Sequence, residues 1–453
     1  MEYLLSAALL VLNLIDYERD LGYVAFTAAG TILFVVLFMV VLRKTKNFLA
    51  SCLVMMCHTW QISWINIFGD PTSKLQLPWF YIIGALIVLY GAFSLHSRGR
   101  KGYSPAVLAL FLIFIVFFNY PLFISRSFSE GLKEYIMIGF YVLVLLSAYI
   151  LRDEVPRYCY ERVKSAFIWA AVSTSVLLIF QYVMYSRFGI TLFKLSLSRY
   201  FNNYQLSCRL LMEDHSCSTI MLGCAVFYIA DRIKKKTWIL YVPSLLAVLV
   251  ALALTSRRTS TLVLAAVSMI YVYFHFKGIG KKFIFSIIFG IGVTVMVYYL
   301  IIVRPVESFA QAINDNGRFE NYLGAIDLIA ENPLGYGYDG TYIASMMPNN
   351  VIPHNTILRW ACMGGVVFPI PLLALILYVM KCARLKGMTA DYWVILYTGV
   401  AANFIPDILN ARFFVIPCAL VFIMDMRDYE QIPPPPLPEQ EEPPGGQKEK
   451  VSA

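Results

Sequence analysis

Charged residues are scarce in this chain. Of its 453 residues, 14% are Asp, Glu, Lys or Arg and 59% are hydrophobic, with a mean hydropathy of +0.67. Soluble domains carry about 25% charged and roughly 45–50% apolar residues, so the composition excludes an ordinary soluble protein. Apolar runs of about 20 residues, each long enough to cross a bilayer as a helix, recur almost from end to end. Because these runs do not alternate polar and apolar residues, the sequence also argues against a β-barrel.

Several other signals are missing. The nine cysteines form no CxxC pair and no Cys/His spacing typical of zinc; Cys208 and Cys217 are expected as thiols, with a disulfide as the alternative. The first apolar stretch lacks a basic start and a small-residue cleavage site, so we expect no cleaved signal peptide. The net charge of +9 does not indicate nucleic-acid binding, because the cations lie at the ends of apolar runs instead of along one element.

What is present predicts an all-α polytopic membrane protein of 13 or 14 transmembrane helices. The count depends on the short first span. The predicted spans are 3–15, 21–42, 47–68, 77–96, 104–125, 134–151, 165–185, 214–231, 237–255, 259–276, 281–303, 355–380, 391–408 and 412–426. Residues 1–427 would form one transmembrane domain. The Pro- and Glu-rich tail, residues 428–453, lacks apolar residues to pack and is expected to be disordered.

The basic loops predict the orientation. They are 43–46, 98–101, 152–164, 232–236, 277–282 and 381–386. With the spans above, all six fall on one face of the membrane. Cytoplasmic loops carry an excess of Lys and Arg, so we predict that this face and the C-terminus are cytoplasmic.

Two long segments then fall outside, at about 186–213 and 304–353. In the second, apolar residues recur at steps of three and four over 318–331, the pattern of an amphipathic helix. Asn332-Pro333-Leu334-Gly335-Tyr336-Gly337 ends it, as Pro and Gly should. Such a helix would lie on the membrane surface or roof a cavity.

Arginines gather on this outer side, against the usual bias. Arg257 and Arg258 lie in a tight turn flanked by Thr and Ser, and the guanidinium fork suits phosphate oxygens. The plain alternative is that they reach for lipid headgroups. Arg209 and Glu213, four residues apart, would share a helical face: either they form a surface ion pair, or Arg209 binds an anion that Glu213 orients or assists in proton transfer.

His354 follows the second long outer segment. A neutral imidazole, with a reference pKa near 6.5, can accept a proton at neutral pH. A histidine at the membrane interface can also be structural. With Arg359 about one helical turn later, His354 is a candidate general base.

In their order, Ser256-Arg257, Arg318 before an amphipathic helix, the Asn332–Gly337 turn, His354-Asn355 and Gly364-Gly365 resemble the O-antigen polymerase and ligase family. The resemblance is strongest over about 250–380. It implies a GT-C-like glycosyltransferase architecture and transfer of a glycan from a polyprenyl-pyrophosphate donor to an acceptor outside the cytoplasmic membrane. It matches Arg257 or Arg258 to the family's pyrophosphate-binding arginine, His354 to the histidine that activates the acceptor hydroxyl, and Arg209 to a further functional arginine.

We therefore predict a glycan polymerase or ligase that needs no metal and inverts the anomeric centre, with Arg318 joining the pyrophosphate site. The acceptor would be a glycan, a lipid or a protein, and nucleic acid is not a partner. One alternative is a metal-dependent glycosyltransferase that uses Asp16, Glu18 and Asp20. Another is a transporter of lipid-linked oligosaccharide, which would place charges and broken helices near the bilayer midplane.

Overall fold

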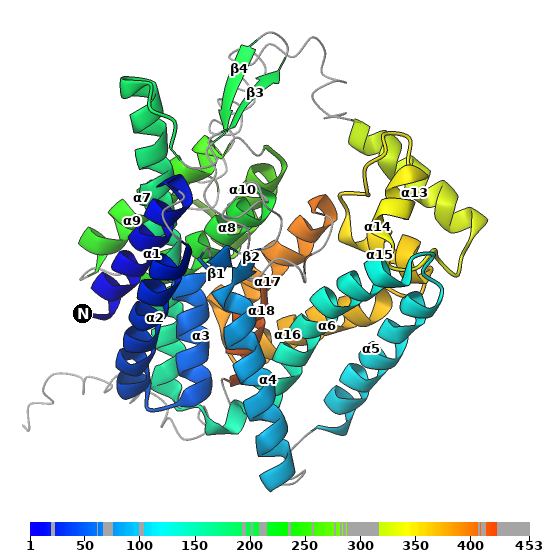
Figure 1. The fold of residues 1–453 in the computed structure, drawn as a ribbon, viewed down its shortest axis with the longest axis horizontal. Helices are drawn as coiled ribbons and strands as arrows, with labels where there is room; N and C mark the ends of the chain where they lie inside the picture. The colour runs from blue at the N-terminus through cyan, green and yellow to red at the C-terminus, as the bar shows by residue number, and fades with distance from the viewer. Residues whose placement is uncertain are drawn as a thin grey trace, which may run out of the picture.

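The computed structural model describes most of the chain and is almost entirely helical (Figure 1). The described residues are 1–19, 23–60, 62–66, 76–98, 104–192, 196–200, 203–207, 215–233, 237–255, 258–275, 278–280, 283, 287, 317–405, 408 and 414–423. Two short antiparallel hairpins interrupt the helices, β1 (Ser63–Asn66) with β2 (Gln76–Pro78) and β3 (Ser196–Tyr200) with β4 (Asn203–Ser207). The prediction of an all-α polytopic membrane protein is confirmed.

The helices follow the apolar runs of the sequence. In chain order they are α1 (Glu2–Arg19), α2 (Tyr23–Thr45), α3 (Phe48–Thr59), α4 (Trp79–Arg98), α5 (Pro105–Phe123), α6 (Phe128–Ile150), α7 (Arg157–Phe188), α8 (His215–Arg232), α9 (Trp238–Leu254), α10 (Arg258–His275), α13 (Arg318–Glu331), α14 (Gly340–Ser345), α15 (Thr356–Gly364), α16 (Ile370–Leu385), α17 (Thr389–Ala401) and α18 (Val415–Ile423). Short 3₁₀ turns follow α6 (Arg152–Glu154) and α17 (η4, Ala402–Phe404). Of these, α2, α4, α6 and α7 are each long and apolar enough to cross a membrane, and several other apolar helices are shorter.

Two predicted spans differ from the structure. The span at 47–68 is helical as far as Thr59, after which the chain continues into β1. The span at 355–380 is two helices, because Gly365 has a φ of +85° and Pro369 precedes α16. The predicted span at 281–303 and the tail at 428–453 lie outside the described residues, apart from 283 and 287.

Basic loops gather at one end of the bundle. Tyr158 donates a hydrogen bond to the carbonyl of Thr45 at 2.5 Å, and Arg232 forms an ion pair with Glu161. The fully buried Asp391 accepts hydrogen bonds from two tyrosines of α7 and α8. We call this end, with residues 43–46, 152–164, 231–232 and 386–391, the basic end. The opposite end, with α13, α14 and α15, is the site end.

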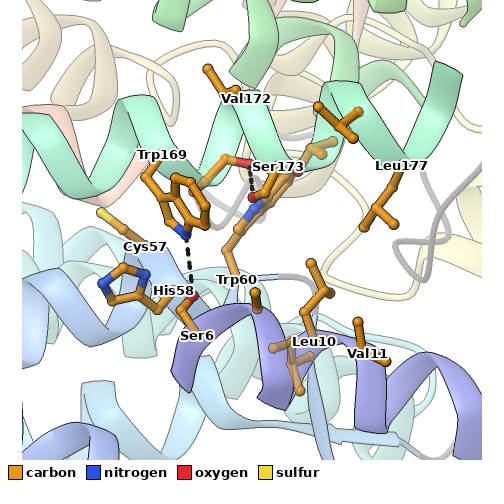
Figure 2. A pocket seen from close by; sticks show the side chains of 15 residues that line it. Ser6, Leu10, Val11, Cys57, His58, Trp60, Trp169, Val172, Ser173 and Leu177 are labelled. Atoms are coloured by element: carbon orange, nitrogen blue, oxygen red, sulfur yellow. Dashed lines mark hydrogen bonds between the residues drawn. The ribbon is translucent and has the colours of Figure 1, made fainter. Parts of the chain in front are cut away.

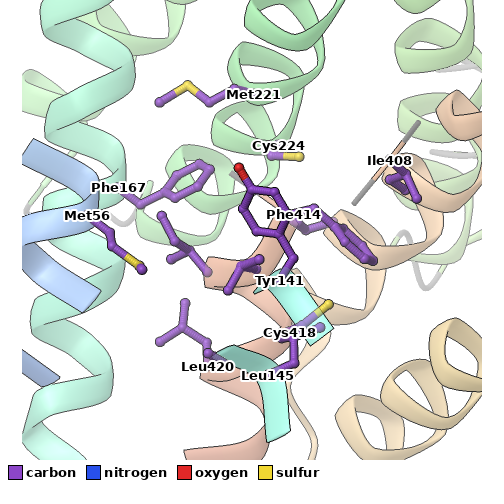
Figure 3. Close-up of a cluster of buried hydrophobic side chains, with 14 of the residues drawn as sticks. Met56, Tyr141, Leu145, Phe167, Met221, Cys224, Ile408, Phe414, Cys418 and Leu420 are labelled. Carbon is purple, nitrogen blue, oxygen red and sulfur yellow. The ribbon is translucent and has the colours of Figure 1, made fainter. Parts of the chain in front are cut away.

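The core lies where α3, α6, α7, α8 and α18 meet (Figure 3). Side chains from all five helices interdigitate there, among them Met56, Tyr141, Phe167, Met221 and Leu420. Cys224 of α8 also lies 3.3 Å from the hydroxyl of Thr398 in α17. This packing fixes α17, which runs from the basic end to the site end.

Candidate functional site

Helix α13 has the predicted boundaries, but Phe319, Leu323 and Ile326, whose spacing predicted it, are exposed. It begins after Gly317, which has a φ of +71°, and it buries Asn321, Ala325 and Leu328. Helix α13 packs against α15, and both lie at the site end beside α14 (Figure 1). The prediction of an amphipathic helix at 318–331 is confirmed.

The turn after α13 pairs its backbone with the end of α15. Tyr336 and Gly337 donate their amides to the carbonyls of Cys362 and Met363, each at 2.8 Å, and Val366 donates to Pro333 at 3.1 Å. The backbones approach so closely that glycine is required. A Cβ at Gly335 would lie 2.5 Å from the amide nitrogen of Gly365, and one at Gly365 would lie 2.3 Å from the carbonyl oxygen of Pro333.

The same turn is tied to the loop between α5 and α6. The amide of Tyr338 donates to Oγ of Ser125 at 2.8 Å, and its hydroxyl donates to the carbonyl of Phe118 at 2.7 Å. The guanidinium of Arg126 lies over the ring of Tyr342 in α14. The segment from 332 to 342 therefore joins α5, α13 and α15 into one unit.

His354 lies between α13 and the end of α17. The hydroxyl of Tyr322 is 3.0 Å from the carbonyl of His354 and 3.4 Å from that of Asn403. Nδ1 of His354 is 3.2 Å from the carbonyl oxygen of Ile352. A carbonyl can only accept, so this contact requires the proton on Nδ1 and leaves the lone pair of the neutral ring on Nε2. Nε2 is then the atom that can accept a proton.

Neighbouring residues hold this arrangement. Asn355 caps α15 by accepting the amide of Leu358 at 3.0 Å, so the backbone at His354 is fixed by the start of a helix. Burial raises the pKa of Tyr322, although the charge of Arg318 acts in the opposite direction. The hydroxyl therefore stays protonated and remains a donor near neutral pH. Arg318 is thus close to the residue that holds the His354 backbone.

The contacts around His354 form one junction between helices, and a second junction lies at the end of α9 and the start of α10. Thr255 ends α9 and receives a hydrogen bond from the Thr219 hydroxyl at 3.2 Å; Arg258 begins α10. The hydroxyl of Tyr397 lies 3.4 Å from the carbonyl of Ser260. A Cβ at Gly223 would lie 2.3 Å from that hydroxyl, so glycine in α8 allows Tyr397 to reach α10.

These two junctions share α17 and its extension. Tyr397 touches the start of α10, and the carbonyl of Asn403 faces the tyrosine that holds His354. Six helical residues span roughly 9 Å. Helix α17 and its extension therefore connect the start of α10 to the segment that contains His354.

Other predicted residues are placed less fully. Arg258 is described by its position in α10, and Asp16 and Glu18 lie in the last turn of α1. The remaining predictions, Arg209, Glu213, Arg257, Asp20 and Cys208, lie outside the described residues.

An ion pair between α6 and α15 was not predicted. Arg359 and Glu134 are joined across 225 positions of sequence, with side chains 7% and 17% exposed. Within the described part of the chain, Nε of Arg359 and Nε1 of Trp360 are buried without a hydrogen-bond partner. The sequence signal was a lone acid at the edge of an apolar span, since ionisable groups at membrane depth are costly and usually paired.

Two apolar hollows of about 240 Å³ each indent the bundle. One lies between α1, α3 and α7, where Trp169 donates to Oγ of Ser6 at 3.4 Å (Figure 2). The other lies between α5 and α6, and its residues Phe118 and Tyr135 contact the ring of Tyr338 at 5.2 and 6.1 Å. The second hollow therefore opens beneath the turn that follows α13.

Together, the apolar helices and the polar, glycine-rich unit at one end define an integral membrane protein with a candidate site at the end of its bundle. Residues 243–369 match the family described as O-antigen ligase, which confirms the resemblance to the O-antigen polymerase and ligase family. That segment contains Arg257, Arg258, Arg318 and His354, whereas Arg209 and Glu213 precede it. No curated protein matches the chain. The match supports O-antigen ligase or polymerase activity in general, and so a glycosyl-transferring membrane enzyme.

Proposed function

We propose that the protein transfers a glycan from a polyprenyl-pyrophosphate donor to an acceptor hydroxyl on the outer side of the cytoplasmic membrane. The gathering of basic loops at the end opposite the site supports this orientation, because such loops favour the cytoplasm. The C-terminus would then be cytoplasmic. The observation that carries the proposal is the contact of His354 Nδ1 with a carbonyl, within the segment that matches the family.

The reaction would be a single displacement. Nε2 of His354 takes the proton of the acceptor hydroxyl as its oxygen attacks the anomeric carbon. The bond from that carbon to the pyrophosphate oxygen breaks, and its electron pair leaves with the pyrophosphate. Attack opposite the leaving group inverts the anomeric centre.

The arginines would stabilise the charge that develops on the leaving group. We assign this role to Arg258, which begins α10, and to Arg257, which precedes it in the sequence; Arg209 and Arg318 would also bind the pyrophosphate, and Glu213 would orient it. Preorganised donors of this kind typically contribute roughly 10²–10³ in rate each. Because pyrophosphate is a good leaving group already, the proposed reaction needs no metal.

The test uses purified protein in lipid vesicles with a purified lipid-linked repeat, and mass spectrometry of the products. His354→Ala and His354→Gln should abolish transfer and preserve donor binding, whereas Arg258→Ala should weaken donor retention. His96→Ala, in the exposed surface of α4, is the matched control and should transfer normally.

Four further measurements separate the alternatives. Loss of transfer in chelator would contradict the metal-free reaction, and retention of the anomeric configuration would contradict the single displacement. Movement of the lipid-linked glycan across the vesicle membrane with no new glycosidic bond would indicate the transporter. Products formed with added glycan, lipid or protein acceptors identify the acceptor class.

A further inference from the structure

An apolar stripe runs along the exposed side of α13. Phe319, Leu323 and Ile326 are 58%, 48% and 51% exposed, and their spacing of four and three places them on one face of the helix. Ala330 continues this face and is exposed as well. Single exposed apolar residues are ordinary, but a contiguous stripe marks an interaction surface.

The opposite face of α13 is already occupied, so the helix cannot rotate to bury the stripe. Asn321 donates its side-chain amide to the carbonyl of Val351 at 3.2 Å. Cys362 of α15 packs its sulfur 3.8 Å from the carbonyl of Ala325. Leu328 is buried on the same side. The stripe must therefore meet something other than α15.

The stripe leads toward the exposed apolar side of α16. Leu334, which follows α13, is 67% exposed, and the hydrogen bond between Val366 and Pro333 places it beside the start of α16. Val366 and Ile370 are 54% and 56% exposed, and Leu377 further along α16 is 64% exposed. In a membrane protein such an exposed apolar surface faces lipid, and the hydrogen bond between Val366 and Pro333 brings it next to the end of the stripe.

Acidic residues limit how deep α13 can lie. Glu320, Asp327 and Glu331 are exposed and, at 100° per residue, fall about 80–120° around the helix from Phe319. They would stay in water while the stripe meets apolar groups. A helix with these two edges fits the plane of a membrane surface and is excluded from the hydrocarbon core.

We propose that α13 lies in the headgroup region of the leaflet at the site end, with Phe319, Leu323 and Ile326 inserted toward the acyl chains. The partner is the bilayer itself. Because the acidic edge does not attract anionic headgroups, the contact depends on apolar insertion and needs no anionic lipid. Because the hydroxyl of Tyr322 holds the carbonyl of His354, this contact also fixes the height of His354 above the membrane.

The test places spin labels on both edges of α13 in zwitterionic phospholipid vesicles. Leu323→Cys and Ile326→Cys report on the stripe, and Asp327→Cys and Glu331→Cys are matched controls on the acidic edge. The background carries serine at Cys208, Cys217 and Cys382, because the other six cysteines are buried. Collisions with oxygen, which concentrates in lipid, and with a water-soluble nickel chelate are measured at each site.

We expect the oxygen-to-nickel collision ratio to be several-fold higher at positions 323 and 326 than at 327 and 331, with no rise on adding anionic lipid. Equal ratios at all four sites would place the stripe in water and overturn the proposal. Protection of positions 323 and 326 from both reagents would show that protein covers the stripe, and would overturn it too. No turnover is measured, so the result is independent of the proposed reaction.

Discussion

Glu134 and Arg359 join α6 to α15 inside the bundle, and breaking this pair is the sharpest test of how the site is held. Arg359 lies in the helix that Asn355 caps directly after His354. Glu134→Leu would leave the guanidinium buried without a counter-charge. Arg359→Leu would likewise leave the carboxylate of Glu134 without a counter-charge.

The burial of the pair sets the expected size of the effect. Removing one partner of a buried ion pair costs about 3–5 kcal/mol, because the remaining charge is uncompensated. The Glu134 side chain is 17% exposed, so we expect each single variant to lose unfolding free energy near the lower figure, about 3 kcal/mol. Replacing both partners by apolar residues removes the uncompensated charge and is often nearly neutral. The double variant should therefore be more stable than either single variant.

The assay is a double-mutant cycle on unfolding of the purified protein in mixed detergent micelles. Glu130→Leu, an exposed acid one turn earlier in α6, controls for the loss of surface charge and should change stability little. If the loss of unfolding free energy in the double variant equalled the sum of the losses in the two single variants, within roughly 0.5 kcal/mol, the two side chains would be energetically independent. That result would refute the ion pair as the link between α6 and α15.

Two further predictions concern the contacts around α17. Gly223→Ala places a Cβ against the hydroxyl of Tyr397 and should lower the free energy of unfolding by about 1–3 kcal/mol through overpacking. Thermal unfolding measures this loss, with Gly278→Ala as the control, because a Cβ there meets nothing within 4 Å. Equal losses of stability in the two variants would contradict the contact. Tyr322→Phe removes the hydroxyl that holds the His354 carbonyl and should cost about 0.5–1.5 kcal/mol. Because burial raises the pKa of Tyr322, this loss should be constant from pH 6 to 9 and change only as the hydroxyl ionises in stronger alkali; a loss that disappears within that range would exclude the hydroxyl as the donor.

The parts of the fold that follow local rules were predictable from the sequence. The apolar steps of three and four over 318–331 gave the boundaries of α13, because the helical repeat places those residues on one side. The Asn332–Gly337 turn ended that helix as its Pro and Gly indicate. Residues 43–46, 152–164 and 231–232, which belong to the predicted basic loops or adjoin them, come together at one end of the described bundle.

The rest depended on contacts between distant residues. The ion pair between α6 and α15 spans 225 positions, and no local pattern couples its two members. Hydropathy alone made 355–380 one span, because Val366 and Val367 continue the apolar run through the break at Gly365. The break is enforced by the backbone of Pro333, which packs against α15 from another part of the chain.

The glycines of the site are better explained by this backbone pairing than by flexibility. Gly335 and Gly365 meet at distances that leave no room for a Cβ, and the amides around them are committed to hydrogen bonds with α15. A segment held in this way is rigid, so it can transmit the position of α5 and α13 to the start of α15. His354 is carried at that start, between a capped helix and the tyrosine of an amphipathic helix. The segment that matches the family therefore combines His354, the proposed base, with glycines that fix where its side chain lies.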